Sequence, residues 1–116
     1  MIRRWVFGAA GLVVASLAVS QARADAVQTA GYRCDRDAWV DATYINAADV
    51  AYAVLVVEGR QVALVAERSG SGARYGPADG GSSGYVWHTK GAEAVLFWRD
   101  AAQAEEMLMR CAEDLQ

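Results

Sequence analysis

The residues best suited to chemistry in this sequence are one lysine, one histidine and a group of serines. Lys90 is the sole lysine among eleven cationic residues, and Gly91 follows it. The stretch from Ser69 to Gly84 contains six of the eleven glycines, and it predicts a loop with a short strand around Ala73–Tyr75. A serine-containing loop and a lysine-glycine turn are therefore the first candidates for a functional site.

These residues allow three catalytic interpretations, each of which lacks a required feature. A phosphate-binding P-loop needs Gly-Lys, whereas the order here is Lys90-Gly91. A serine hydrolase would have to use His88, the only histidine, but no helix is predicted after the serines, as a nucleophile elbow requires. Its candidate nucleophiles are Ser69, Ser71, Ser82 and Ser83. A Ser71–Lys90 dyad needs a desolvated lysine, and a hairpin tip offers little burial. A hydrolase is therefore a less favoured interpretation, and no cofactor is expected.

Composition limits the architecture that can position these residues. The chain has 116 residues, of which 54% are hydrophobic and 22% charged, so a single packed domain is expected. The formal net charge of −3 argues against a nucleic-acid partner, because such proteins need a basic face.

The N-terminus resembles an export signal. Arg3 and Arg4 precede an apolar run, and Ala22-Arg23-Ala24 supplies small residues for cleavage. The run is too short for a membrane span, which needs roughly 20 residues. We interpret residues 1–24 as a removed signal and residues 25–116 as the mature domain, with a charge of 8 − 14 = −6. We expect a periplasmic protein without a lipid anchor, because no cysteine stands at the cleavage point.

The two cysteines lie near the two ends of the mature chain. In an oxidising compartment, Cys34 and Cys111 would form a disulfide. The competing interpretation is two free thiols. Two cysteines and one histidine are too few ligands for a closed zinc site, so no metal is expected.

Short strands with hairpin spacing dominate the rest of the chain. Residues 25–31 look frayed. The predicted strands are 32–34, 39–46, 50–57, 61–67, 85–89 and 92–98, with hairpin turns at Gly59-Arg60 and Lys90-Gly91. The tail is ambiguous, because its composition favours helix while Met107–Ala112 could form a closing strand. An all-β fold, a small antiparallel barrel or sandwich, follows.

An ordered series of motifs resembles the Gram-negative bacterial inhibitors of C-type lysozyme, a family with membrane-bound and periplasmic members. The series is Tyr32-x-Cys34, Val40-x-Ala42-x-Tyr44-x-Asn46, Ser69-Gly70-Ser71-Gly72-Ala73-Arg74-Tyr75, Trp87-x-x-Lys90-Gly91-x-Glu93-Ala94-x-Leu96 and Cys111. Tyr85 and Trp87 both fit the aromatic position that the family places before Lys-Gly.

The resemblance implies an eight-stranded antiparallel barrel with one disulfide, and a C-type lysozyme as the protein partner. Its site residues would be Ser71, Gly72 and Tyr75 on the first loop and Lys90 and Gly91 on the second. These loops would enter the lysozyme cleft and engage its catalytic carboxyl groups. The alternative is a small secreted barrel that binds a ligand in its interior. The sequence leaves open whether the protein is a monomer or a homodimer.

Overall fold

Eight β-strands and one short 3-10 helix, η1, make up the part of the chain that the structure describes. This structure, a computed structural model, describes residues 26–79 and 83–115; the expected signal and Ser82 lie outside them. The elements are β1 (Ala26–Cys34), η1 (Asp35–Asp37), β2 (Trp39–Asn46), β3 (Ala51–Val57), β4 (Arg60–Glu67), β5 (Ala73–Pro77), β6 (Gly84–Lys90), β7 (Glu93–Arg99) and β8 (Glu105–Glu113).

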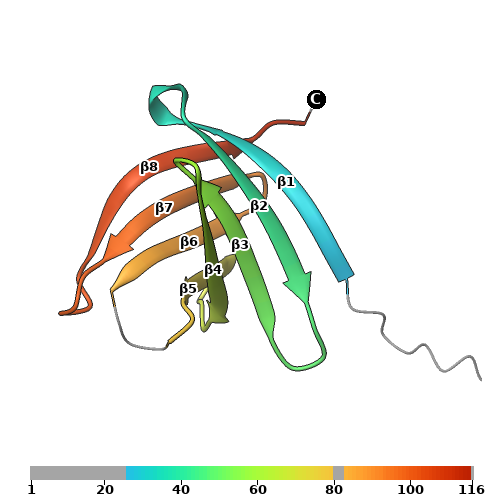
Figure 1. Ribbon diagram of the computed structural model, residues 1–116, viewed down its shortest axis with the longest axis vertical. Helices are drawn as coiled ribbons and strands as arrows, with labels where there is room; N and C mark the ends of the chain where they lie inside the picture. Colours follow the sequence, from blue (N-terminus) through green and yellow to red (C-terminus); the bar gives the residue numbers. More distant parts are fainter. Residues whose placement is uncertain (1–25, 80–82, 116) are drawn as a thin grey trace, which may run out of the picture.

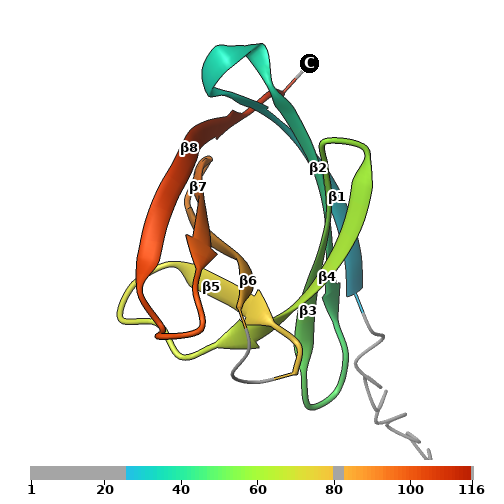
Figure 2. The ribbon, with the colours of Figure 1, turned by 60° about the vertical axis from the view of Figure 1, so that its left-hand side comes forward.

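The strands close into an antiparallel barrel. Each strand pairs with the next along the chain, and β8 pairs with β1. Figure 2 looks into the ring that results, and in Figure 1 the strands β6–β8 run across β1–β3. Closure leaves no long unpaired edge. The predicted fold class is confirmed, with the barrel rather than the sandwich.

Alternating side chains fill the barrel interior. In β2, Val40 and Ala42 are buried while their neighbours Trp39 and Asp41 are exposed, as a half-buried strand requires. The largest fully buried side chains of the core cluster, each less than 2% exposed, are Trp87, Leu55, Leu64, Leu96 and Val40. The interior is therefore a packed core.

The N-terminal segment departs from the prediction of frayed structure. β1 begins at Ala26 and stays in register with β2, from Ala26 opposite Asn46 to Arg33 opposite Trp39. The short, mixed-polarity sequence gives little local strand signal. Pairing with β2 supplies the backbone hydrogen bonds that order this segment.

Both predicted hairpin turns are displaced by one residue. The first turn is Glu58-Gly59, with φ of 51° and 75°, and Arg60 already belongs to β4. Two positive φ values are those of a type I′ turn. In the second turn, Lys90 pairs with Glu93, so Lys90 ends β6 and Gly91 begins the turn. The lysine thus sits on a strand end.

The ambiguous tail is a strand. β8 pairs with β7 from Glu105 to Ala112 and with β1 at its end, and a register shift occurs between Leu96 and Phe97. Asp100 orders the preceding turn, since its carboxylate accepts hydrogen bonds from the amides of Ala102 and Ala104. Pairing on both sides outweighs the helical propensity of the segment.

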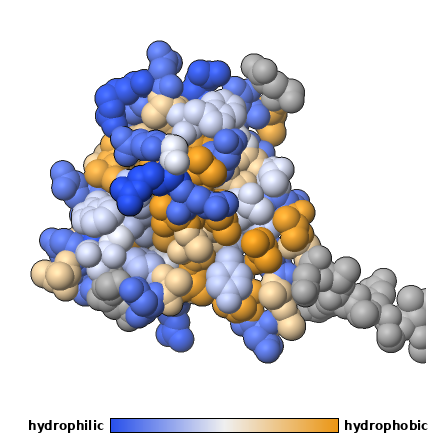
Figure 3. All heavy atoms as spheres, in the orientation of Figure 1, coloured by the Kyte–Doolittle hydropathy of each residue, from blue (hydrophilic) through white to orange (hydrophobic). Residues whose placement is uncertain are grey.

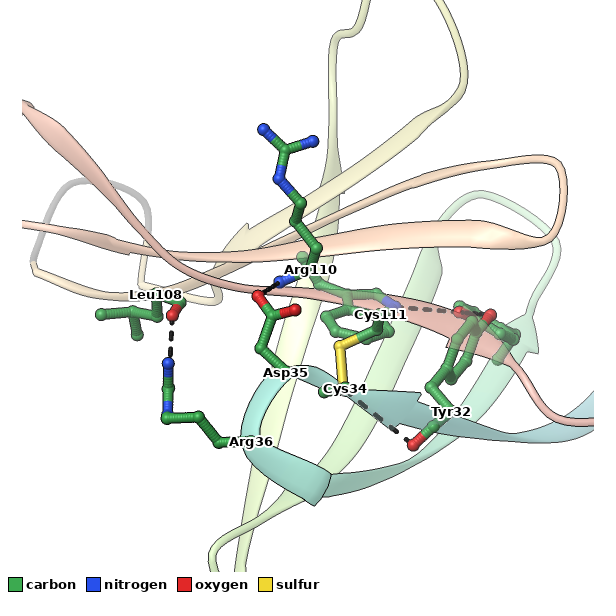
Figure 4. The surroundings of a disulfide bond; sticks show 9 residues. Tyr32, Cys34, Asp35, Arg36, Leu108, Arg110 and Cys111 are labelled. Atoms are coloured by element: carbon green, nitrogen blue, oxygen red, sulfur yellow. Dashed lines mark hydrogen bonds between the residues drawn. A yellow bond between two sulfur atoms is a disulfide. The ribbon is translucent and has the colours of Figure 1, made fainter.

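A disulfide joins the two strands that close the barrel. Cys34 and Cys111 are register partners across the β1–β8 seam, and their sulfurs are bonded. Figure 4 shows η1 against β8 beside this bond, where the Arg110 amide donates to Asp35 at 2.8 Å. The predicted pairing is confirmed, and it covalently fixes a seam of only three residue pairs.

The outer surface differs between the two halves of the barrel. Hydrophobic side chains gather over β2 and β3 in Figure 3, where Tyr52 and Val56 are exposed. The outer face of β4, β5, β7 and β8 instead carries charged pairs. Among the described residues, no helix is long and apolar enough to cross a membrane.

Candidate functional site

The two predicted loops lie side by side. Ala73 pairs with Thr89, so the loop between β4 and β5 (residues 68–72) ends beside the end of β6. Gly72 has φ +68°, and a side chain there would collide with the carbonyl oxygen of Thr89. A Cβ at that position would also lie 3.3 Å from the Cβ of Lys90. Glycine thus permits a close approach between the serine loop and the lysine.

The exposed residues of this site are Ser71, Gly72, Lys90 and Gly91. Side chains alternate along β6, so Lys90 and His88 point away from the interior that Trp87 fills. The serine loop lies against this outer side of β6. A hydroxyl and an ammonium group are consequently presented on adjoining backbone segments, and both can donate hydrogen bonds.

Hydrogen bonds to one carbonyl order the serine loop. The Oγ of Ser69 donates to the backbone oxygen of Ser71 at 2.7 Å, and Nε2 of His88 lies 3.0 Å from the same oxygen. A carbonyl only accepts, so His88 is the donor. The imidazole therefore contacts the backbone of Ser71 and not its hydroxyl, unlike the base of a hydrolase triad.

Tyr75 lies beneath the loops and not on their surface. Its side chain is only 9% exposed and packs on Tyr44, with ring centroids 5.8 Å apart. The Tyr44 hydroxyl bonds that of Tyr32 at 2.6 Å and accepts from Trp87 Nε1 at 2.9 Å. Burial raises the pKa of all three tyrosines, so their hydroxyls stay neutral. This aromatic cluster supports the site from inside the barrel.

A recess of about 390 Å³ opens beside the aromatic cluster. Tyr32, Tyr44 and Tyr75 line it together with Thr89 and Gly91, among others. Trp87 fills the core beneath the recess, whereas Tyr85 packs edge-on against Trp98, with ring centroids 5.2 Å apart. The two aromatic residues before Lys90 thus have different roles in the fold.

Four charged residues brace the ends of the serine loop. Glu67 precedes the loop and Arg74 follows it, and Arg99 binds Glu67 through two hydrogen bonds of 2.7 and 2.8 Å. Glu105 joins the cluster through Arg99 at 2.9 Å and through Arg74. Gly76 leaves room for this cluster because it has no side chain; a Cβ at this position would collide with the Glu67 carboxylate. Both strands that flank the loop are thereby tied to β7 and β8.

This charge cluster predicts a pH dependence of stability. Hydrogen bonds from Arg99 lower the pKa of Glu67 below its ordinary 4.5, and bonds from Arg74 do the same for Glu105. Their stabilisation is complete above pH 4.5 and is lost as the pH falls through the depressed values. Denaturant unfolding of Glu67→Gln/Glu105→Gln, between about pH 7 and pH 3, should show a weaker pH dependence than wild type. Glu106→Gln, at an exposed position, is the control and should keep the pH dependence of the wild type. If the free energy of unfolding of the double variant changes with pH as steeply as that of the wild type, the role of the cluster is contradicted.

Sequence patterns do not reveal the charge cluster or the contact between His88 and the carbonyl of Ser71. Positions 67, 74, 99 and 105 come from four strands, so no local pattern signals their meeting. From the sequence, His88 is a candidate only for the base of a serine hydrolase. Its position two residues before Lys90 was the available signal, because that spacing puts both on one face of a strand.

Comparisons with known proteins place this geometry in context. A family model described as membrane-bound lysozyme-inhibitor of C-type lysozyme matches residues 32–105. A membrane-bound lysozyme inhibitor of C-type lysozyme from Cupriavidus necator is 40% identical over 79 residues, 68% of this chain and 58% of that protein. The crystal structure of Pseudomonas aeruginosa MliC in complex with hen egg white lysozyme aligns with a TM-score of 0.61 and 25% identity, covering 78% of this chain and 85% of that one.

Proposed function

Because this chain belongs to the family of membrane-bound lysozyme inhibitors of C-type lysozyme, we propose that it is a protein inhibitor of C-type lysozymes and not an enzyme. The observation that carries the proposal is the adjacency of the two exposed loops, with Gly72 against Thr89 and Lys90. The P. aeruginosa relative is known in a complex with hen egg white lysozyme. The same class of partner suits the hydroxyl and ammonium groups of this site.

The proposed mechanism is occupation of the catalytic cleft by both loops. A C-type lysozyme uses two carboxyl groups, one protonated as general acid and one ionised. The ammonium of Lys90 would neutralise the ionised carboxylate, while the Ser71 hydroxyl would donate to one carboxyl and accept from the other. Gly72 and Gly91 would let the backbone approach the cleft closely. Tyr75 would act by supporting the first loop from below.

A ligand-binding barrel is the less favoured alternative. Leu55, Trp87 and Leu96, each at most 1% exposed, fill the middle of the barrel, so in the described part of the chain a ligand there would have only the recess of about 390 Å³ beside the tyrosines. The inhibitor proposal uses only the exposed loops. It therefore agrees better with the packed interior.

The proposed location is the periplasm. The N-terminal sequence has the features of an export signal, and the Cys34–Cys111 disulfide suits an oxidising compartment. A bacterial cell exposes its wall to lysozyme in this compartment, so an inhibitor there would meet its target.

A lysozyme assay tests the proposal. The protein is expressed with its own leader, purified from the periplasmic fraction and added to lysozyme acting on a suspension of bacterial cell walls. We expect clearing of the suspension to stop as the protein approaches one equivalent. Clearing that continues at a large molar excess of folded protein would reject the proposal.

Ser71→Ala should weaken inhibition less than loss of the lysine. The variant removes one hydroxyl hydrogen bond, which corresponds to about 1 to 3 kcal/mol in the complex. Because Ser71 and Lys90 lie on adjoining segments, the double variant should depart from the sum of the single losses. Inhibition constants from lysozyme titration give both values, with circular dichroism to verify the fold. An unchanged constant in Ser71→Ala would remove the hydroxyl from the mechanism.

A further inference from the structure

We propose that His88 is a positioning residue that holds the serine loop in its binding conformation. This inference rests on the proposed function, since the loop is taken to be the part that enters lysozyme. The imidazole comes from β6, the strand that ends with Lys90. One strand would thus carry the lysine and also fix the loop that carries the serine.

The geometry of the contact supports positioning over direct binding. Nε2 of His88 donates to the carbonyl of Ser71 at 3.0 Å, so this ring nitrogen is directed at the loop. Ser69 supplies the second donor to that carbonyl from within the loop at 2.7 Å. His88 is therefore the donor that links this carbonyl to a barrel strand, whereas the Ser69 bond is internal to the loop.

Residues on the two neighbouring strands flank His88. Arg74 and Val95 are its register partners on β5 and β7, and Arg74 is held in the charge cluster with Glu105. Both the neutral ring protonated on Nε2 and the imidazolium can donate to a carbonyl. The contact is thus compatible with either protonation state.

The expected consequence is a preordered loop. A glycine-rich segment loses much conformational entropy when it becomes fixed. Ordering it before binding reduces the entropy lost on association. Removing the His88 contact should weaken inhibition roughly 2- to 10-fold, as expected for one hydrogen bond.

Two substitutions at this position separate the possible roles. His88→Ala removes the donor, whereas His88→Gln keeps an N–H at a similar reach and should restore it. ¹⁵N relaxation of the free protein gives order parameters for the amides of Ser71 and Gly72. We expect a rigid value near 0.85 in wild type and His88→Gln, and a value below about 0.6 in His88→Ala. Ser69→Ala combined with His88→Ala should loosen the loop further.

The same variants are then titrated against lysozyme. The proposal requires weaker inhibition by His88→Ala and near wild-type inhibition by His88→Gln. Weaker inhibition with unchanged order parameters would make His88 a direct contact and overturn the proposal, as would a loosened loop that inhibits fully. If the wild-type protein does not inhibit, the proposed function fails, while the order parameters of the free protein still decide whether His88 holds the loop.

Discussion

Lys90→Ala is expected to weaken inhibition of a C-type lysozyme by about 30-fold to several thousand-fold. The variant would leave an ionised carboxylate of the enzyme without its cation inside the complex. Truncating one member of such a buried charge pair commonly costs about 2 to 5 kcal/mol, most of it seen as faster dissociation. The inhibition constant and the dissociation rate, measured on the same preparation, should change together.

The chain offers a matched control for this variant. Arg60 lies at the start of β4, next to the Glu58-Gly59 turn, and it is an exposed cation on a different hairpin. Arg60→Ala removes the same unit of charge from the protein and should leave the inhibition constant almost unchanged. Equal losses in both variants would show that net charge matters and that Lys90 has no specific contact. An unchanged constant in folded Lys90→Ala would contradict the mechanism.

Replacing both cysteines should cost the fold about 4 to 5 kcal/mol. The Cys34–Cys111 bond spans 77 residues, and the chain-entropy account of such a loop gives this magnitude. A small domain has about 5 to 15 kcal/mol of total stability, so the loss is a large part of it. Guanidinium unfolding of Cys34→Ala/Cys111→Ala measures the difference directly.

Reduced wild-type protein is the control for the cysteine variant. Reduction breaks the cross-link without removing the sulfur atoms that pack in the core. Similar losses in both samples would assign the effect to the cross-link, whereas a loss confined to the alanine variant would assign it to packing. A difference below about 1 kcal/mol between oxidised and reduced protein would contradict the role of the bond at the barrel seam.

The sequence predicted the fold where local pattern and structure agree. β2 has the predicted bounds, Trp39–Asn46, because its alternation reflects one buried face. The prediction failed for residues 26–31, where the strand depends on a partner ten to twenty positions away. It was also one residue off at Glu58, since that turn needs a positive φ at a residue other than glycine. The first error comes from pairing between strands, which local propensity does not encode, and the second comes from the backbone conformation of one residue.

The candidate site was predictable in its residues but not in the contacts between them. Lys90 and Ser71 stood out by residue type and by the family resemblance, and the glycines explained how a loop could approach closely. No local pattern indicates that Gly72 lies against Thr89 or that His88 reaches the carbonyl of Ser71. These contacts depend on the pairing of β5 with β6, which brings residues 73 and 89 together.

Competition for the lysozyme cleft tests the central claim most directly. The affinity of the purified protein for a C-type lysozyme is measured by titration calorimetry with and without a saturating soluble cell-wall oligosaccharide, which occupies the cleft. If both loops enter the cleft, the oligosaccharide competes with the protein. Once the oligosaccharide concentration exceeds the dissociation constant of the oligosaccharide for lysozyme, the apparent dissociation constant of the protein should rise in proportion to that concentration. Binding of the protein with unchanged affinity to the oligosaccharide-filled enzyme would contradict the account.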